Sequence, residues 1–142
     1  MRYHAQTEAL IRSSARTARS CGHSYVGSAH LLVALTRMPG GTGQLLRGLG
    51  VEPELAEDLT QLLYGAGTPD LPLPQGLTAG ARRILRRAAG EAKNQNRRQI
   101  EPVHVLMAMA RQQDCGAEQV LQLTGISADQ LLTSAVEQLR WE

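Results

Sequence analysis

The chain has 142 residues, of which 42% are hydrophobic and 20% are charged, and its formal net charge is +2. These values are typical of one globular domain and argue against a disordered chain, a disulfide-rich scaffold and a strongly basic nucleic-acid binder. With no Phe, one Trp and three Tyr, the core has to be built from aliphatic side chains, which favours close-packed helices over a sheet. The chain has no apolar run long enough for a transmembrane helix.

The first part of the chain has the pattern of four helices joined by short turns. Between residues 5 and 20, Ile11, Ala15 and Ala18 recur at helical spacing and mark a buried face. Ser28 is predicted as the N-cap of a strongly apolar second helix, and Gly50 as the left-handed residue after the third. The four helices are expected at about 5–20, 28–37, 42–49 and 53–64.

Residues 65–77 contain three prolines and three glycines, which predicts an extended connector.

A second set of four helices is predicted after this connector. Thr78 is the predicted N-cap of the first, Pro102 suits the opening turn of the second, and Gly125 is expected to end the third. Ser127 and Gln130 form a predicted capping box for the fourth. The first of these helices is expected to start at about 78, and the other three are expected at about 101–112, 117–124 and 128–139.

The two parts of the chain are related by an internal duplication. The segment 27–37 aligns with 101–111 at an offset of 74, which places His30 on His104 and Arg37 on Arg111. The sequence therefore predicts one all-α domain over residues 1–142. It comprises two tandem four-helix repeats, about 4–64 and 78–140, with pseudo-twofold symmetry and eight helices in total. Repeats of this size are marginally stable alone, so we expect them to share a core.

The motif at residues 22–35, Gly-His-Ser-Tyr-Val-Gly-Ser-Ala-His-Leu-Leu-Val-Ala-Leu, carries a family resemblance. Together with the second copy, it resembles the N-terminal double-repeat domain of Clp ATP-dependent unfoldases, nearest to the ClpC and ClpA type. The second copy is more divergent: it keeps His104 and loses both glycines of the motif. The resemblance implies an eight-helical domain without catalytic activity, which receives adaptors and substrates for the ATPase rings and their protease.

Some members of that family bind phosphoarginine, through a Glu of the motif and a Thr that opens the first helix of each copy. Carried over by position, the Glu places are Ala29 and Val103, and the Thr places are His4 and Thr78. Thr78 alone matches. A guanidinium group pairs with a carboxylate, which Ala29 and Val103 do not supply.

The predicted protein-binding surface is a groove between the two copies. Its wall is expected to include Ser28, Ala29, Thr78, Pro102 and Val103. The first helix of the second copy is rich in arginine, and Arg82 and Arg86 are candidates for contact with an acidic or phosphorylated partner.

Several residues invite a chemical interpretation that the sequence does not favour. His30 and His104 are predicted to be structural, hydrogen-bonded histidines. Cys21 and His23, with His30 or His4, form a weak set of metal ligands because a second ligand pair is missing, so no metal site is predicted. The chain has no phosphate loop and no set of nucleophile, base and orienting group. We therefore predict neither an enzyme nor a cofactor.

The predicted function is that of a cytoplasmic, non-catalytic domain that docks adaptors or substrates for a Clp unfoldase. Two alternatives stay open: a free-standing accessory protein of a Clp protease that lacks an ATPase, and a helical protein that binds nucleic acid through its arginine-rich helices. Nucleic acid is the less favoured partner because no aromatic stacking residues accompany the arginines. No association with a membrane is expected.

Overall fold

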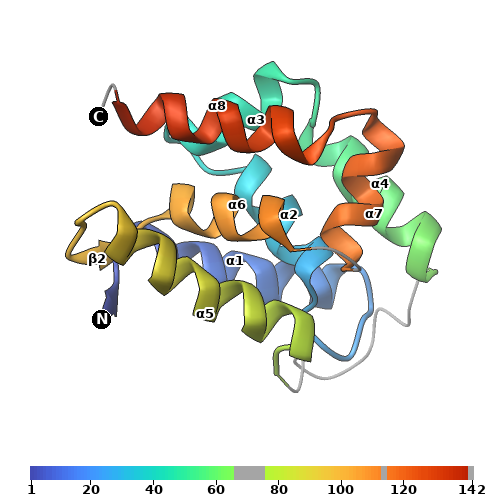
Figure 1. Ribbon diagram of the computed structural model, residues 1–142. Coiled ribbons are helices and arrows are strands. Elements are labelled where there is room, and N and C mark those ends of the chain that lie inside the picture. Colours follow the sequence, from blue (N-terminus) through green and yellow to red (C-terminus); the bar gives the residue numbers. More distant parts are fainter. Residues whose placement is uncertain (66–75, 113–114, 141–142) are drawn as a thin grey trace.

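The computed structural model describes residues 1–65, 76–112 and 115–140 (Figure 1). These residues form an all-α fold with eight helices, as the sequence predicts, and the predicted ends agree with the observed ones to within a residue or two. The helices are α1 (Ala5–Ser20), α2 (Ser28–Thr36), α3 (Gly41–Gly48), α4 (Pro53–Tyr64), α5 (Ala79–Asn94), α6 (Pro102–Arg111), α7 (Gly116–Thr124) and α8 (Ala128–Arg140).

Helices α2 and α6 form the centre of the molecule, as Figure 1 shows. Helices α1 and α5 cover them on one side, and α3, α4, α7 and α8 on the other. All nine residues of α2 are buried, which explains its continuous apolar sequence: a helix surrounded by neighbours has no solvent face to keep polar.

The core is aliphatic, as the composition predicts. Leu31, Leu32, Leu106 and Met107 are fully buried in α2 and α6, and Met109 is 1% exposed. Each such leucine contributes about 2 kcal/mol of hydrophobic stabilisation. Met107 and Met109 are therefore core residues, and neither side chain is available as a binding surface.

Two short strands add a small parallel pairing to the helices. Strand β1 (Arg2–Tyr3) pairs with β2 (Gln99–Ile100), and an isolated parallel bridge joins Val26 to Leu77. The second pairing repeats the first, because Tyr3 and Leu77 are equivalent at the offset of 74, as are Val26 and Ile100. The segment that leads into each copy thus pairs with a loop of the other copy.

Backbone hydrogen bonds join the two copies in the same reciprocal way. The N–H of His4 donates to Ile100 O, and the N–H of Thr78 donates to Val26 O, both at 2.9 Å. Since each bond is the other shifted by 74 residues, the duplicated sequence makes duplicated contacts between its two copies. These reciprocal bonds are the arrangement expected of a pseudo-twofold axis. The exact repeat boundaries stay a prediction.

Two of the predicted helix-end residues are observed in their predicted roles, and one is not. Thr78 is the N-cap of α5, where its hydroxyl accepts the Ala81 N–H at 3.1 Å, and Gly125 ends α7 in the left-handed conformation with φ 81°. The prediction that Ser28 caps α2 is wrong: Gly27 is the N-cap. The Ser28 hydroxyl instead accepts the N–H of Ala117 in α7 at 3.0 Å, so it caps a helix of the other copy.

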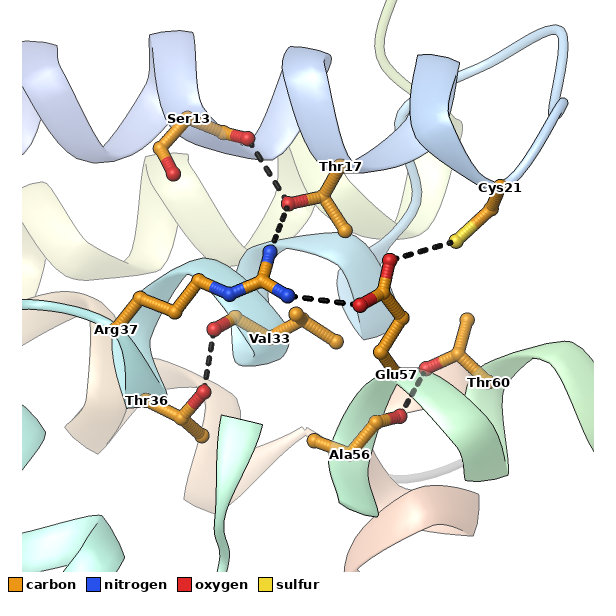
Figure 2. Close-up of polar contacts among 9 residues, drawn as sticks. All are labelled: Ser13, Thr17, Cys21, Val33, Thr36, Arg37, Ala56, Glu57 and Thr60. Carbon is orange, nitrogen blue, oxygen red and sulfur yellow. Dashed lines mark hydrogen bonds and ion pairs between the residues drawn. The ribbon is translucent and has the colours of Figure 1, made fainter. Parts of the chain in front are cut away.

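A polar network at the C-terminal end of α2 links α1, α2 and α4 (Figure 2). Nη2 of Arg37, just after α2, pairs with Glu57 Oε2 of α4 at 2.7 Å, and Nη1 donates to Thr17 Oγ1 of α1 at 3.4 Å. The Cys21 thiol donates to the other carboxylate oxygen of Glu57 at 3.7 Å. Because the ion pair is partly exposed, it is worth about 1 kcal/mol or less.

The second copy has a related contact. Arg111 is equivalent to Arg37, and it forms an ion pair with Glu91 of α5, which is equivalent to Thr17 of α1. In both copies, therefore, an arginine at the end of the central helix reaches back to the first helix of its own copy.

Most of the predicted connector, residues 66–75, lies outside the described residues. Gly65 and Gly76 at its two ends both have positive φ, at 79° and 149°, and neither is helical. Within the described part of the chain, none of the helices has the length and apolarity needed to cross a bilayer.

Candidate functional site

An open pocket of about 330 Å³ lies where three helices begin. We call it the α2–α5–α7 pocket. Its wall includes Ser28 and Ala29 of α2, Thr78 and Gly80 at the start of α5, and Gly116 at the start of α7. Because α2 belongs to the first copy and α5 and α7 to the second, the pocket lies between the two copies. Figure 1 shows the starts of α2, α5 and α7 approaching one another at one end of the molecule.

The structure divides the predicted groove. Ser28, Ala29 and Thr78 line the α2–α5–α7 pocket, whereas Pro102 and Val103 line a separate cavity of about 40 Å³ beside Gln6 and Thr42. Val103 is the counterpart of Ala29 in the duplication, so the two hollows occupy equivalent places in the two copies. Ala29 and Val103 are each 2% exposed, which leaves both as walls with little surface for a partner.

The arginines of α5 are also divided. Arg82 and Arg86 line a third hollow of about 340 Å³, with Tyr3 and Leu77, and Arg82 Nη1 donates to Leu77 O at 3.2 Å. Arg83 instead lines the α2–α5–α7 pocket. Arg83 was not among the residues predicted from the sequence, because which arginine of a consecutive pair faces the other copy depends on the rotation of α5 against α2 and α7.

Two histidines form a hydrogen-bonded chain along the edge of the pocket. The Gly27 N–H donates to His30 Nδ1 at 2.9 Å, the two rings meet at His30 Nε2 and His23 Nδ1 at 2.8 Å, and His23 Nε2 lies 2.8 Å from Gly65 O. The backbone N–H only donates and the carbonyl only accepts. Both rings are therefore neutral, with the proton on Nε2, and the bonds all run in one direction from Gly27 to Gly65.

Burial, together with the neighbouring His23 ring, lowers the pKa of His30 to about 4. A second proton on His30 would sit on Nδ1, facing the Gly27 N–H, and would replace a hydrogen bond with a clash of two donors. In the second copy, His104 Nδ1 accepts the N–H of Glu101 at 2.8 Å. The prediction that His30 and His104 are structural, hydrogen-bonded residues is confirmed.

The structure brings Cys21, His23 and His30 together, with one ligand atom from each inside a span of 4.8 Å. His4 is not part of this group; it caps α1, where its Nδ1 accepts the Gln6 N–H. A metal-bound imidazole normally keeps a proton on its other ring nitrogen and donates it. In His30 that nitrogen already accepts the Gly27 N–H, so a metal on Nε2 would leave the ring without a proton or break the cap. The geometry favours the hydrogen-bonded chain over a metal centre.

Cys21 is also poorly suited to act as a nucleophile. Burial raises the pKa of its thiol, and the neighbouring Glu57 carboxylate raises it further. A protonated thiol is unreactive compared with a thiolate. Cys21 and Cys115 are both buried free thiols.

Comparison with protein families decides the relationship. The model of the Clp repeat (R) N-terminal domain matches residues 2–122 and again residues 76–140. The chain belongs to this family. The second match begins near the predicted start of the second copy. The family's domain is a regulatory part of Clp proteins and not a catalytic one, which is also the expectation from the sequence.

Curated relatives are Clp ATPase subunits. The ClpA homolog of Porphyra purpurea, an ATP-dependent Clp protease ATP-binding subunit, is 25% identical over 133 residues, which are 92% of this chain and 16% of the relative. The chloroplastic chaperone protein ClpC1 of Oryza sativa subsp. japonica is 25% identical over 130 residues, 89% of this chain and 14% of the relative. The Clp N domain thus spans only about one seventh of the length of these relatives.

Solved structures show the same fold. The N-terminal domain of the chaperone ClpD from Arabidopsis thaliana superimposes with a TM-score of 0.79 at 22% identity, and the match covers 97% of both chains. The Hsp104 N-terminal domain from Candida albicans gives a TM-score of 0.75 at 17% identity, covering 97% of this chain and 91% of the other. The all-α fold is therefore the one shared by Clp N domains.

Proposed function

We propose that this Clp N domain docks adaptor proteins or unfolding substrates for a Clp ATP-dependent unfoldase, and that they bind in the α2–α5–α7 pocket. The observation that carries the proposal is the pocket itself: an open hollow of about 330 Å³ at the interface of the two copies, in a domain whose family has a regulatory role. Hollows of this size accommodate one or two side chains of a partner.

Two aromatic side chains give the pocket its binding character. Tyr25 and Tyr64 both line it, and they are 50% and 52% exposed. The Tyr64 hydroxyl donates to Gln119 Oε1 at 3.3 Å, which holds the ring over the start of α7. A Cβ at position 116 would overlap Tyr64 Oη, so Gly116 is needed for this close approach. Fixed, half-exposed tyrosines are efficient anchors because they bury a large area at low entropic cost.

The equivalent hollow of the second copy is a weaker candidate. Its volume is about 40 Å³, close to the space of a single water molecule. Pro102 and Val103 are both buried beside it. We infer that, of these two equivalent hollows, the one lined by Ser28, Ala29 and Thr78 is the usable docking pocket.

Docking in this pocket would tether a client near the entrance of an ATPase ring, with no chemical change to the client. Contact with ATPase rings and a protease, and a cytoplasmic location, are parts of the same proposal; the plastid location belongs to the rice relative named above. The free-standing accessory protein remains the second form that the proposal can take, and the open reading frame around this sequence distinguishes the two.

Amide chemical shifts measured during a titration with an unfolded polypeptide test the proposal. Reduced, carboxymethylated lactalbumin is a suitable probe because it has no stable fold. We expect the largest shifts at Ser28, Gly80 and Gly116, and small ones at Val103. Shifts confined to α3 and α8, or no binding at all, would overturn the proposed site.

The nucleic-acid alternative has its own signature. Arg82 and Arg86 are exposed on α5, so a single-stranded oligonucleotide bound there would lose affinity steeply as salt is raised. We expect no measurable binding at 150 mM salt, a concentration near the physiological ionic strength of about 0.15 M.

A further inference from the structure

The charge of the α2–α5–α7 pocket limits what it can bind. Among the described residues that line it, Arg83 is the one with a full charge at neutral pH, and none is a carboxylate. Arg37, Arg97 and Arg111 each form an ion pair with a glutamate. Arg83 forms no ion pair or hydrogen bond with any residue in the described part of the chain. None of the described residues therefore pairs with the guanidinium of this pocket-lining arginine.

The position that would reverse this charge is apolar here. The family resemblance places a glutamate at position 29, where it would pair with a guanidinium. This chain has Ala29, which is 2% exposed. A cationic ligand would find no carboxylate among the described residues of the wall and would be repelled by Arg83, so these residues disfavour cations.

The starts of three helices add partial positive charge on the same side. Ser28 is the first residue of α2, Gly80 the second of α5, and Gly116 the first of α7, and all three line the pocket. One N–H is already capped in two of these helices, Ala117 N–H by Ser28 Oγ in α7 and Ala81 N–H by Thr78 Oγ1 in α5, whereas the N-cap residue of α2 makes no side-chain hydrogen bond. The ends of these helices favour an anion, in addition to the full charge of Arg83.

The remaining wall is apolar and aromatic, from Ala29, Cys115, Tyr25 and Tyr64. A small inorganic anion would leave that surface in contact with water, because the hollow of about 330 Å³ is much larger than such an ion. A peptide that carries one acidic side chain between apolar residues would satisfy both parts of the wall.

We propose that the α2–α5–α7 pocket binds a peptide segment with a carboxylate flanked by apolar side chains, and that Arg83 pairs with this carboxylate. The inference rests on the proposed function and specifies the class of segment that adaptors or substrates present. The pocket of this chain is expected to prefer an anionic ligand, whereas a glutamate at position 29 would favour a cationic one.

Two capped tetrapeptides test the inference, acetyl-Leu-Leu-Glu-Leu-amide and its neutral counterpart with Gln in place of Glu. Each is titrated into the whole chain, and the dissociation constant is taken from the amide shifts of Ser28, Gly80 and Gly116. A charge-assisted pair with helix ends behind it predicts about tenfold tighter binding of the Glu peptide. The Arg83→Gln variant should reduce that ratio to about one. Arg87→Gln is the matched control, because Arg87 lies one turn further along α5, is exposed and is not among the lining residues.

Each outcome supports or overturns the proposed pairing. Equal affinity for the two peptides, or a ratio that Arg83→Gln leaves unchanged, overturns it; if the shifts still map to the pocket, the docking function stands. Binding of neither peptide also overturns it, and the lactalbumin titration then decides the docking function independently. Loss of the ratio in Arg87→Gln as well overturns it too, because general positive charge on α5, and not Arg83, would then attract the peptide.

Discussion

The structure predicts that the protein loses unfolding free energy in acid because of His30. The pKa of His30 is about 4 in the folded protein, against 6.5 for a histidine side chain in water. The unfolded chain therefore binds a proton first as the pH falls. The stabilisation from a neutral His30 is complete above pH 6.5 and is lost between pH 6.5 and 4. The difference between the two pKa values corresponds to a loss of about 3 kcal/mol of unfolding free energy.

The variant that isolates this effect is His30→Gln. A glutamine three residues after the N-cap can accept the Gly27 N–H, as in a capping box, and its amide can donate to His23 Nδ1. It does not titrate. Urea unfolding followed by circular dichroism at pH 7 and pH 4 gives the loss of unfolding free energy for each protein. We expect the wild type to lose about 3 kcal/mol more than His30→Gln over this interval.

The comparison cancels other acid effects, because the carboxylates and His104 are present in both proteins. Equal losses in the two proteins would refute the reasoning, since His30 would then be free to take up a proton in the folded state. A smaller difference of about 1 kcal/mol would mean that the folded pKa lies less than one unit below 6.5.

Other substitutions test the core, a helix interior and the cap between copies, each by urea unfolding. Leu106→Ala should cost about 2–5 kcal/mol because the side chain is fully buried, whereas Leu62→Ala, at a side chain that is 74% exposed, should change the stability by about 0.5 kcal/mol or less. Gly90→Ala should stabilise α5 by about 0.5–1 kcal/mol, since a Cβ there meets nothing within 4 Å. Ser28→Ala should cost about 1 kcal/mol, because Ala117 N–H loses its acceptor; an unchanged midpoint would refute the cap.

Much of the fold could be predicted from the sequence, because the relevant signals are local or repeated. Gly125 and Thr78 mark helix ends by their own backbone and side-chain chemistry. The duplication was visible because His30 and His104 recur at an offset of 74, as do Arg37 and Arg111. Each histidine also accepts the N–H of the N-cap residue of its own helix. The apolar run of α2 predicted a buried helix, and its complete burial explains why the run has no polar face.

The site was harder to predict, because it depends on contacts between the copies. Serine is a typical N-cap residue, yet the Ser28 hydroxyl caps α7, 89 residues further along the chain. No local pattern indicates such a partner. Nor does the sequence show that Arg82 and Arg83 line different hollows: adjacent residues on a helix point about 100° apart, so one step in sequence separates two different surfaces.

The residues of the predicted groove line two separate hollows. Treating the two copies as equivalent placed Ala29 and Val103 on one wall, but the structure puts them in hollows of about 330 Å³ and about 40 Å³. The duplication preserves the helices and their caps, while side chains at the equivalent pockets have diverged. Symmetry in sequence was therefore a good guide to the backbone and a poor guide to the size of the hollows between the copies.

The central claim, that the α2–α5–α7 pocket is the docking site, is tested most directly by a pair of leucine substitutions in α5. Gly80 lines the pocket, and a Cβ at this position would be 3.8 Å from its nearest neighbour, so Gly80→Leu fills the pocket without a backbone clash. Gly90→Leu adds the same side chain to the same helix, where a Cβ meets nothing within 4 Å. Fluorescence anisotropy of labelled, unfolded lactalbumin should show at least about tenfold weaker binding to Gly80→Leu and wild-type binding to Gly90→Leu. Wild-type affinity in Gly80→Leu, with its fold intact by circular dichroism, would contradict the account.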